Sequence, residues 1–174
     1  MTIPVIETER LILRDRRLAD FESFAAMWSD PQVVRHMGDG KPLTEETVWT
    51  SFLRAVGHWV VLGYGSWAID EKASGKLIGS AGFNNMKRDR GPEYKDVLEM
   101  GWMFETDASG KGYATEAVCA ALAWGKLQFG AIRVIALTAP ENFASIRVAQ
   151  KCGFAECARI LSVGRPRIVL DRVL

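Results

Sequence analysis

The chain has few of the residue types that build metal or disulfide sites. Its 174 residues include only three cysteines and two histidines. Cys119, Cys152 and Cys157 lack paired C-x-x-C spacing, and His36 and His58 lie far from them in the sequence. We therefore expect no metal site and no disulfide framework, and we expect the three thiols to be reduced and in the core.

An excess of one charge and long apolar runs are also absent. The 22 basic and 21 acidic residues are scattered and leave a net charge of +1, so nucleic acid is not an expected partner. No apolar run approaches the about 20 residues of a membrane span, and the N-terminus is too polar for a signal peptide. We expect no membrane partner, a cytoplasmic location and a single domain over residues 1–174.

Hydrophobic periodicity predicts strands and helices that alternate along the chain. The expected helices cover residues 18–29, the stretch from a cap at Thr44 to a break at Gly63, 113–129 and 145–152. The expected strands lie near residues 11–13, 67–70, 77–83, 97–104, 133–138, 155–161 and 167–173. The order strand, helix, strand over 97–138 implies a right-handed parallel crossover, so these two strands share one mixed sheet.

A glycine turn, Ser109 to Glu116, follows an apolar strand and opens the predicted helix 113–129. Gly110 and Gly112 let the backbone approach an anion closely, and the free amides of the first helical turn point toward it with the helix dipole behind them. Lys111 either adds a positive charge at this site or is a solvated lysine. The turn therefore predicts a binding site for a pyrophosphate.

Two nucleotide motifs do not fit the turn. A dinucleotide fingerprint needs a third glycine where Thr115 stands, and a helix rather than a strand follows. A Walker A loop needs a lysine after its last glycine, and Gly112 is followed by Tyr113. Neither nucleotide motif is met, so the turn gives no support to an enzyme that binds nucleotide phosphates.

Three segments resemble the GNAT acetyltransferases. Gly112-Tyr113-Ala114 matches the second half of the family's acetyl-CoA loop, Arg/Gln-x-x-Gly-x-Gly/Ala, with Ser109 in the place of Arg or Gln. The family's next segment, N-x-x-S-x-x-V-x-x-K-x-G-F, is matched by Asn142, Ser145, Val148, Lys151, Gly153 and Phe154. Glu7 to Arg14 resembles the opening strand of the ribosomal-protein alanine N-acetyltransferase branch. The resemblance covers nearly the whole chain.

The resemblance implies an α/β fold with a mixed, mostly antiparallel sheet of about seven strands, one parallel crossover pair and about four flanking helices. It implies acetyl transfer from acetyl-CoA, without a metal, to a primary amine of a protein N-terminus or a small molecule. The expected cofactor contacts are Trp102, Met103, Phe104, Ser109, Gly110, Lys111, Gly112, Tyr113, Ala114, Thr115 and Asn142. A homodimer stays open.

Glu99 is the candidate general base. Strand alternation puts it on one face with Gly101 and Met103, as a lone carboxylate in an apolar segment. Desolvation favours the protonated form of a carboxylate, which suits a group that takes a proton from an ammonium directly or through water. The alternative is a strand carboxylate that pairs with a nearby Arg or Lys on a solvated face.

The proton donor to the thiolate is not the family's usual tyrosine, because Ala149 occupies that position. Ser145 and Asn142, one turn earlier, are the candidates, by direct donation or through a water that they orient; otherwise the thiolate leaves unassisted. Ser145 is alternatively the cap of the predicted helix 145–152. The absence of Arg or Gln at Ser109 also removes a side chain that could brace the loop.

The acceptor cleft is expected between the first two predicted helices and the polar loop 84–96, which alternatively is only a surface connection. The candidates to line this cleft are Trp28, His36, Met37 and Trp49. Aromatic residues at helical spacing, however, usually pack in a core. The competing function is a CoA-binding sensor or inactive relative without turnover, which the missing tyrosine at Ala149 favours. An enzyme that binds nucleotide phosphates is a third hypothesis, which tight ATP binding without CoA binding would favour.

Overall fold

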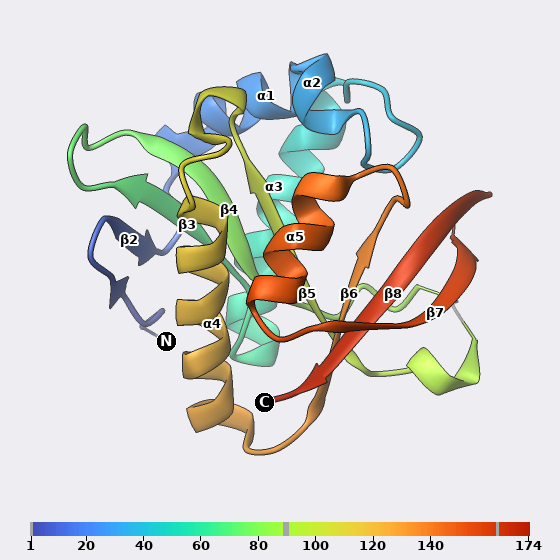
Figure 1. The fold of residues 1–174 in the computed structure, drawn as a ribbon. Helices are drawn as coiled ribbons and strands as arrows, with labels where there is room; N and C mark the ends of the chain where they lie inside the picture. The colour runs from blue at the N-terminus through green and yellow to red at the C-terminus, as the bar shows by residue number, and fades with distance from the viewer. Residues whose placement is uncertain (1, 89–90, 163) are drawn as a thin grey trace.

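The computed structural model in Figure 1 describes residues 2–88, 91–162 and 164–174, and its described strands form one sheet. The strand order is β1-β2-β3-β4-β5-β6-β8-β7, and neighbours run antiparallel except for the parallel pair β5 and β6. The strands are β1 (Ile6–Glu7), β2 (Leu11–Arg14), β3 (Ser66–Glu71), β4 (Leu77–Asn84), β5 (Leu98–Phe104), β6 (Arg133–Thr138), β7 (Ala155–Ser162) and β8 (Arg165–Val173).

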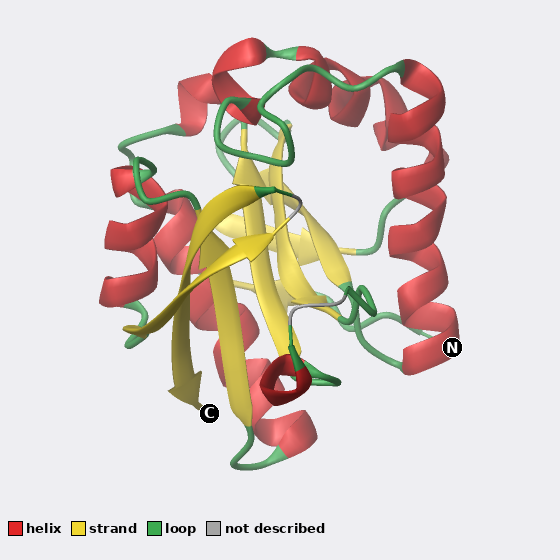
Figure 2. Cartoon of the chain, turned by 90° about the vertical axis from the view of Figure 1, so that its right-hand side faces the viewer, coloured by secondary structure: helices red, strands yellow, loops and turns green. Residues whose placement is uncertain are grey.

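Helices cover both faces of this sheet. They are α1 (Phe21–Ser29), α2 (Pro31–Val34), α3 (Glu45–Leu62), α4 (Tyr113–Phe129) and α5 (Phe143–Lys151). Figure 1 shows α4 and α5 in front of the sheet and α3 behind it, and the turned view in Figure 2 shows the sheet between these two layers. The predicted fold, a mixed and mostly antiparallel sheet with one parallel crossover and flanking helices, is confirmed.

Two helix boundaries follow local capping. The predicted helix 18–29 begins as a 3-10 turn over Leu18–Asp20 before α1. Asp30 then ends α1 and caps α2, because its carboxylate accepts the amide N–H of Gln32 at 2.8 Å. Within the described part of the chain, none of the helices combines the length and the apolarity that crossing a membrane requires.

The strand predicted near residues 11–13 is β2, and a turn at Thr8–Arg10 separates it from β1 within the segment Glu7–Arg14. The carboxylate of Glu116 accepts the Thr8 hydroxyl at 2.6 Å and the Arg10 amide N–H at 2.9 Å. These bonds to α4 replace the ladder bonds that a continuous strand would make at this position. The turn lies against the start of α4 for this reason.

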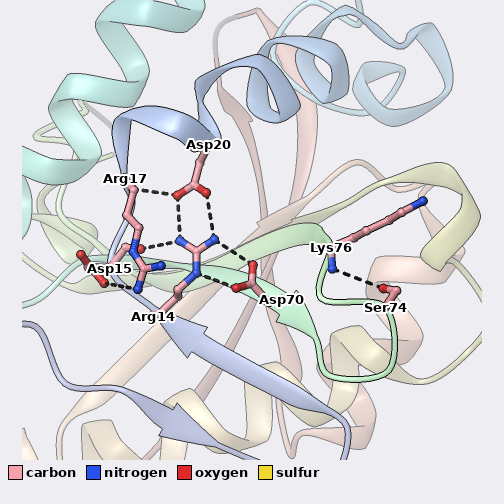
Figure 3. A network of polar contacts seen from close by, with 7 residues as sticks. All are labelled: Arg14, Asp15, Arg17, Asp20, Asp70, Ser74 and Lys76. Atoms are coloured by element: carbon pink, nitrogen blue, oxygen red, sulfur yellow. Dashed lines mark hydrogen bonds and ion pairs between the residues drawn. The ribbon is translucent and has the colours of Figure 1, made fainter.

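Arg14 of β2 lies between two carboxylates, as Figure 3 shows. Its guanidinium donates to both oxygens of Asp20, at 2.8 Å each, and to both of Asp70, at 2.6 and 2.9 Å. Burial would raise the pKa of Asp20, but hydrogen bonds from Arg14 and from the Arg17 amide outweigh it and hold that pKa below its usual value. The network ties β2 to β3 and to the entrance of α1.

Strand β5 separates two apolar clusters, as its alternation predicted. Leu98 and Met100 belong to the main core under α4, whereas Met103 packs with Phe24 and Phe52 of α1 and α3. The two faces of one strand therefore contact different helix layers.

The prediction of three core thiols is wrong for two of them. Cys119 and Cys157 are exposed, and of the three cysteines Cys152 alone is buried. The Cys152 sulfur lies 3.3 Å from that of Cys119. Burial raises the pKa of the Cys152 thiol to about 12, so this thiol stays protonated at neutral pH.

Candidate active site

The parallel strands β5 and β6 separate soon after they meet. Their pairing covers only Leu98 with Val134 and Glu99 with Ile135. Beyond these residues the two strands diverge, which is visible in Figure 1, whereas the other edge of β5 stays paired with β4 as far as Phe104. In the described chain, the β6-facing edge of β5 near Phe104 therefore has no strand partner, and its backbone groups can bind an extended ligand.

A cleft of about 460 Å³ borders this edge and reaches the start of α4 and the side of α5. It brings together most of the predicted site residues: Trp102, Met103, Phe104, Ser109, Gly110, Gly112, Tyr113, Ala114, Thr115, Asn142 and Ser145. We call the part at residues 109–115 the α4 end. The opposite part, which we call the α2 end, is lined by Gln32, Val33, Arg35, His36 and Met37.

The α4 end has the geometry of an anion site. Gly110 and Gly112 adopt φ of 79° and 84°, a region that favours glycine. The first backbone hydrogen bond of α4 runs from the amide N–H of Glu116 to the carbonyl oxygen of Gly112. The amides of Tyr113 to Thr115, in the turn before it, therefore have no acceptor within the helix. No side chain caps this end, and a Cβ atom at Gly110 would meet nothing within 4 Å. The amides are therefore open to an anion, with the helix dipole behind them.

Arg10 braces this loop, and the sequence analysis missed it. Its Nε donates to Glu116 at 2.7 Å, and its Nη1 donates to the carbonyl oxygen of Lys111 at 2.9 Å. The centre of its guanidinium lies 4.6 Å from the centroid of the Tyr113 ring. The β1–β2 turn thus supplies the brace that Ser109 cannot. The nearest sequence signal is Thr8 and Arg10 beside the predicted strand, but spacing alone does not reveal their partner 106 residues away.

The two residues that flank Gly112, Lys111 and Tyr113, lie in different surroundings. Lys111 is exposed and is not among the residues that line the cleft. The Tyr113 hydroxyl donates to the carboxylate of Glu71, and this hydrogen bond raises the pKa of Tyr113. The phenol is therefore neutral and its hydroxyl is held by Glu71 at the end of β3.

Helix α5 forms the other wall of the cleft. It begins at Phe143, two residues earlier than predicted, and Asn142 caps it by accepting the amide N–H of Ser145 at 3.1 Å. The alternative of Ser145 as the cap is therefore wrong, and within the described residues its hydroxyl makes no hydrogen bond. Arg147 and Lys151 of the same helix also line the cleft and add positive charge to it.

Glu99 lies on β5, three residues before Trp102, but it lines a different cavity. Its side chain is 15% exposed, and its Oε1 lies 3.8 Å from Nη1 of Arg88. Asn84 of β4 is its cross-strand neighbour, and the cavity that both residues line is formed by the loop from β4 to β5. The structure therefore places Glu99 on the strand that borders the cleft, outside the set of residues that line it.

Two of the four acceptor candidates line the cleft. His36 and Met37 are at the α2 end. Burial, and to a smaller extent the charge of Arg35, lowers the pKa of His36. Trp28 and Trp49 instead pack on the second apolar cluster, where the Trp49 ring stacks on that of Phe52. Trp28 is partly buried there, as helical spacing predicts, whereas Trp49 is 38% exposed.

Residues 10–155 match the family described as Acetyltransferase (GNAT) domain. An uncharacterized protein of Bacillus subtilis, YkkB, is 32% identical over 172 residues, which cover 95% of this chain and 93% of that protein. A structure from Bordetella pertussis named as a GnaT-family acetyltransferase has a TM-score of 0.86 at 30% identity and covers 98% of this chain and 99% of its own.

A more distant structure shares the fold alone. RimL, named as a ribosomal L7/L12 alpha-N-protein acetyltransferase and solved in complex with coenzyme A, has a TM-score of 0.80 at 14% identity and covers 98% of both chains. The family match and the two nearer relatives span most of the chain, including the glycine turn and the Asn142 segment. The chain therefore belongs to the GNAT acetyltransferase family and is an acyltransferase that takes its acetyl group from acetyl-CoA.

Proposed function

We propose that the cleft holds acetyl-CoA along β5 and at the α4 end, and that residues 1–174 act as one domain that acetylates a primary amine. The observation that carries the proposal is the free edge of β5 beside the uncapped N-terminus of α4 in a single cleft. An extended arm with amide groups and a pyrophosphate would need both features side by side. The coenzyme A complex of RimL, which has the same fold, supports the proposal.

The residues present fit this cosubstrate. Backbone groups of Trp102 to Phe104 would bind the pantetheine arm as a neighbouring strand does. The amides of Gly110 through Thr115 would bind the pyrophosphate, with Ser109 and Lys111 beside them and positive charge from Arg147 and Lys151. Asn142 uses its side-chain oxygen for the cap, so its NH₂ group would contact the arm.

Glu99 would act as the general base, with Ser145 and Asn142 on the side of the leaving thiol. Glu99 would take a proton from the ammonium of the acceptor through one or more water molecules, since it lies on β5, the strand that borders the cleft. The Ser145 hydroxyl, which is not used as a cap, would give a proton to the departing sulfur, or Asn142 would orient a water to do so. A thiol pKa of about 8.5 makes unassisted departure feasible as well.

For the acceptor, we propose an amine of the kind used by the ribosomal-protein alanine branch, a protein N-terminus, or a small-molecule amine. The opening segment around Arg10 and the shared fold with RimL support this branch. The expected alternative, a CoA-binding protein without turnover, rested on Ala149 at the position of the family's tyrosine and does not agree with membership of an acetyltransferase family. Release of free thiol from acetyl-CoA, compared between peptides and small amines, distinguishes the two classes of acceptor.

Glu99→Gln tests the base. We expect it to leave acetyl-CoA affinity intact and to lower turnover by about 100-fold or more, because the amide of glutamine cannot accept the proton of the acceptor ammonium. Glu156→Gln is the control, because Glu156 is an exposed residue of β7 that pairs with Arg159. Equal turnover of wild type and Glu99→Gln at every pH would remove Glu99 from the reaction.

A further inference from the structure

Arg165 and Arg167 of β8 carry positive charge that the described protein does not neutralise. They are two residues apart, so their side chains share one face of the strand. Arg167 is only 9% exposed, yet neither guanidinium forms an ion pair with a carboxylate of the described residues. Burial of an unpaired charge is costly, because the solvation that water gave is lost without a replacement.

Both guanidinium groups converge on one carbonyl oxygen. Gly38 accepts Nη2 of Arg167 at 2.9 Å and Nη1 of Arg165 at 3.3 Å. The same loop approaches closely at Gly40, where a Cβ atom would lie 2.9 Å from Nη1 of Arg165. A carbonyl is neutral, so these bonds position the arginines without balancing their charge. Each guanidinium has five N–H donors, and most of them stay available.

The loop that they contact continues the α2 end of the cleft. Gly38 follows Met37 directly, and Figure 2 shows this loop next to the hairpin of β7 and β8. Burial and the nearby charge of Arg165 lower the pKa of Arg167. The exposed carboxylate of Glu141 attracts Arg167 and His36 without pairing with either. The α2 end is therefore a site of positive potential opposite the α4 end.

We propose that the acceptor is a small amine that carries an oxyanion, a carboxylate or a phosphate group, and that Arg165 and Arg167 bind this oxyanion beside Gly38. The inference rests on the proposed function, since it assigns the acceptor to the α2 end. The planar, forked guanidinium is suited to oxyanions because it can donate two parallel hydrogen bonds. A peptide N-terminus without a nearby anionic group would leave both charges unbalanced.

Matched amine pairs test the charge requirement. Alanine is compared with alaninamide, and phosphoethanolamine with ethanolamine, by thiol release from acetyl-CoA. We expect kcat/KM to be at least tenfold higher for an anionic member than for its neutral partner, and the pair with the larger preference distinguishes carboxylate from phosphate. In Arg167→Gln and Arg165→Gln the preference should disappear through KM. Arg159→Gln, an exposed arginine of β7, should keep it.

A binding measurement keeps the inference separate from turnover. Inorganic phosphate is added to wild type and to both variants, each saturated with CoA, and the thermal unfolding midpoint is recorded against sodium chloride of equal ionic strength. Phosphate should stabilise wild type and Arg159→Gln but not Arg165→Gln or Arg167→Gln. Arg165 is less buried than Arg167, so Arg165→Gln serves if the other variant does not fold.

The outcomes distinguish the two proposals. The inference would be overturned if phosphate stabilised all variants equally. It would also be overturned if neutral amines, or peptides regardless of charge, were acetylated faster, or if the preference for anionic amines survived in both arginine variants. Failure of acetyl-CoA to bind would instead contradict the proposed function. The phosphate difference between wild type and Arg165→Gln remains readable in that case, in protein without CoA.

Discussion

Two pairs of arginines, one near each end of the chain, hold neighbouring segments of the fold in different ways. Arg10 donates to a loop carbonyl at the α4 end and is also paired with Glu116. Arg14, four residues later, is buried between two aspartates. Both positive charges of the N-terminal pair are therefore balanced by carboxylates of the protein.

Arg165 and Arg167 donate to the carbonyl of Gly38 at the α2 end and have no carboxylate partner among the described residues. Where an arginine only has to hold a loop, an ion pair gives the bond without the cost of an unbalanced buried charge. Two arginines without a carboxylate partner lower the stability of the fold, but they can still bind an anion. Functional sites commonly combine such a loss of stability with a gain in binding. The predictions below break or sharpen this comparison.

The largest effect is expected for Arg14→Met. The change leaves Asp20 and Asp70 partly buried without their cation, which should lower the free energy of unfolding by about 3–5 kcal/mol. Urea unfolding at neutral pH measures it. Arg167→Met is the matched control, because it removes an unpaired charge, and it should change stability by less than about 1 kcal/mol or raise it. Similar losses of unfolding free energy in Arg14→Met and Arg167→Met would contradict the distinction between arginines with and without carboxylate partners.

Gly112→Val should weaken acetyl-CoA binding by about 100-fold, which is about 2.7 kcal/mol. A β-branched residue at φ 84° is strained, its Cβ would lie 3.3 Å from Arg10 Nη2, and its methyl groups would crowd the open amides. Calorimetric titration measures the affinity. Gly75→Val introduces a similar strain at φ 66° in the turn between β3 and β4, with open space around it, and should keep the affinity of wild type.

Arg10→Gln should weaken acetyl-CoA binding by about tenfold, or about 1.4 kcal/mol. The variant loses the charge-assisted bond to Glu116 and the bond to the loop carbonyl, so the loop is less preorganised for the anion. The same titration measures it. Arg133→Gln breaks a comparable exposed pair with Asp171 and should leave affinity unchanged. Unaltered acetyl-CoA binding in Arg10→Gln would mean that Arg10 forms only a surface ion pair with Glu116 and does not prepare the loop for the anion.

Acid should destabilise the protein partly through the carboxylates that pair with Arg10 and Arg14, and not through Arg165 and Arg167. The pKa of Asp20 and that of Glu116 are lowered in the folded state, because hydrogen bonds to the ionised forms outweigh burial. Their contribution is therefore present above the unfolded pKa values of about 4 and is lost as pH falls through the lower folded values. Urea midpoints between neutral pH and about pH 3 measure the loss. Asp20→Asn should flatten the dependence, and Arg165→Gln should not.

Much of the fold follows from local patterns in the sequence. Long periodic segments such as α3 and α4 have capping signals at Thr44, Gly63 and Gly130, and the alternation of β5 is decided within seven residues. Two of the short elements, β1 and α2, carry too few residues for any period. Their limits depend instead on contacts with Glu116 and on the cap by Asp30.

The site could be predicted where its residues are close in sequence. The glycine turn and the Asn142 segment carry their own spacing, and the structure brings most of their residues into one cleft. Arg10 and Arg167 have no such signal, because an arginine's partner is decided by strands and loops more than 100 residues apart. The same limit explains why sequence spacing could not tell that Glu99 borders the cleft without lining it.

Titration calorimetry of the wild-type protein with acetyl-CoA tests the central claim most directly. The account predicts one binding site per chain with micromolar affinity, since a free strand edge and an open helix N-terminus are both present in one cleft. Absence of binding at millimolar acetyl-CoA would contradict it, and the glycine turn would then serve only to start α4.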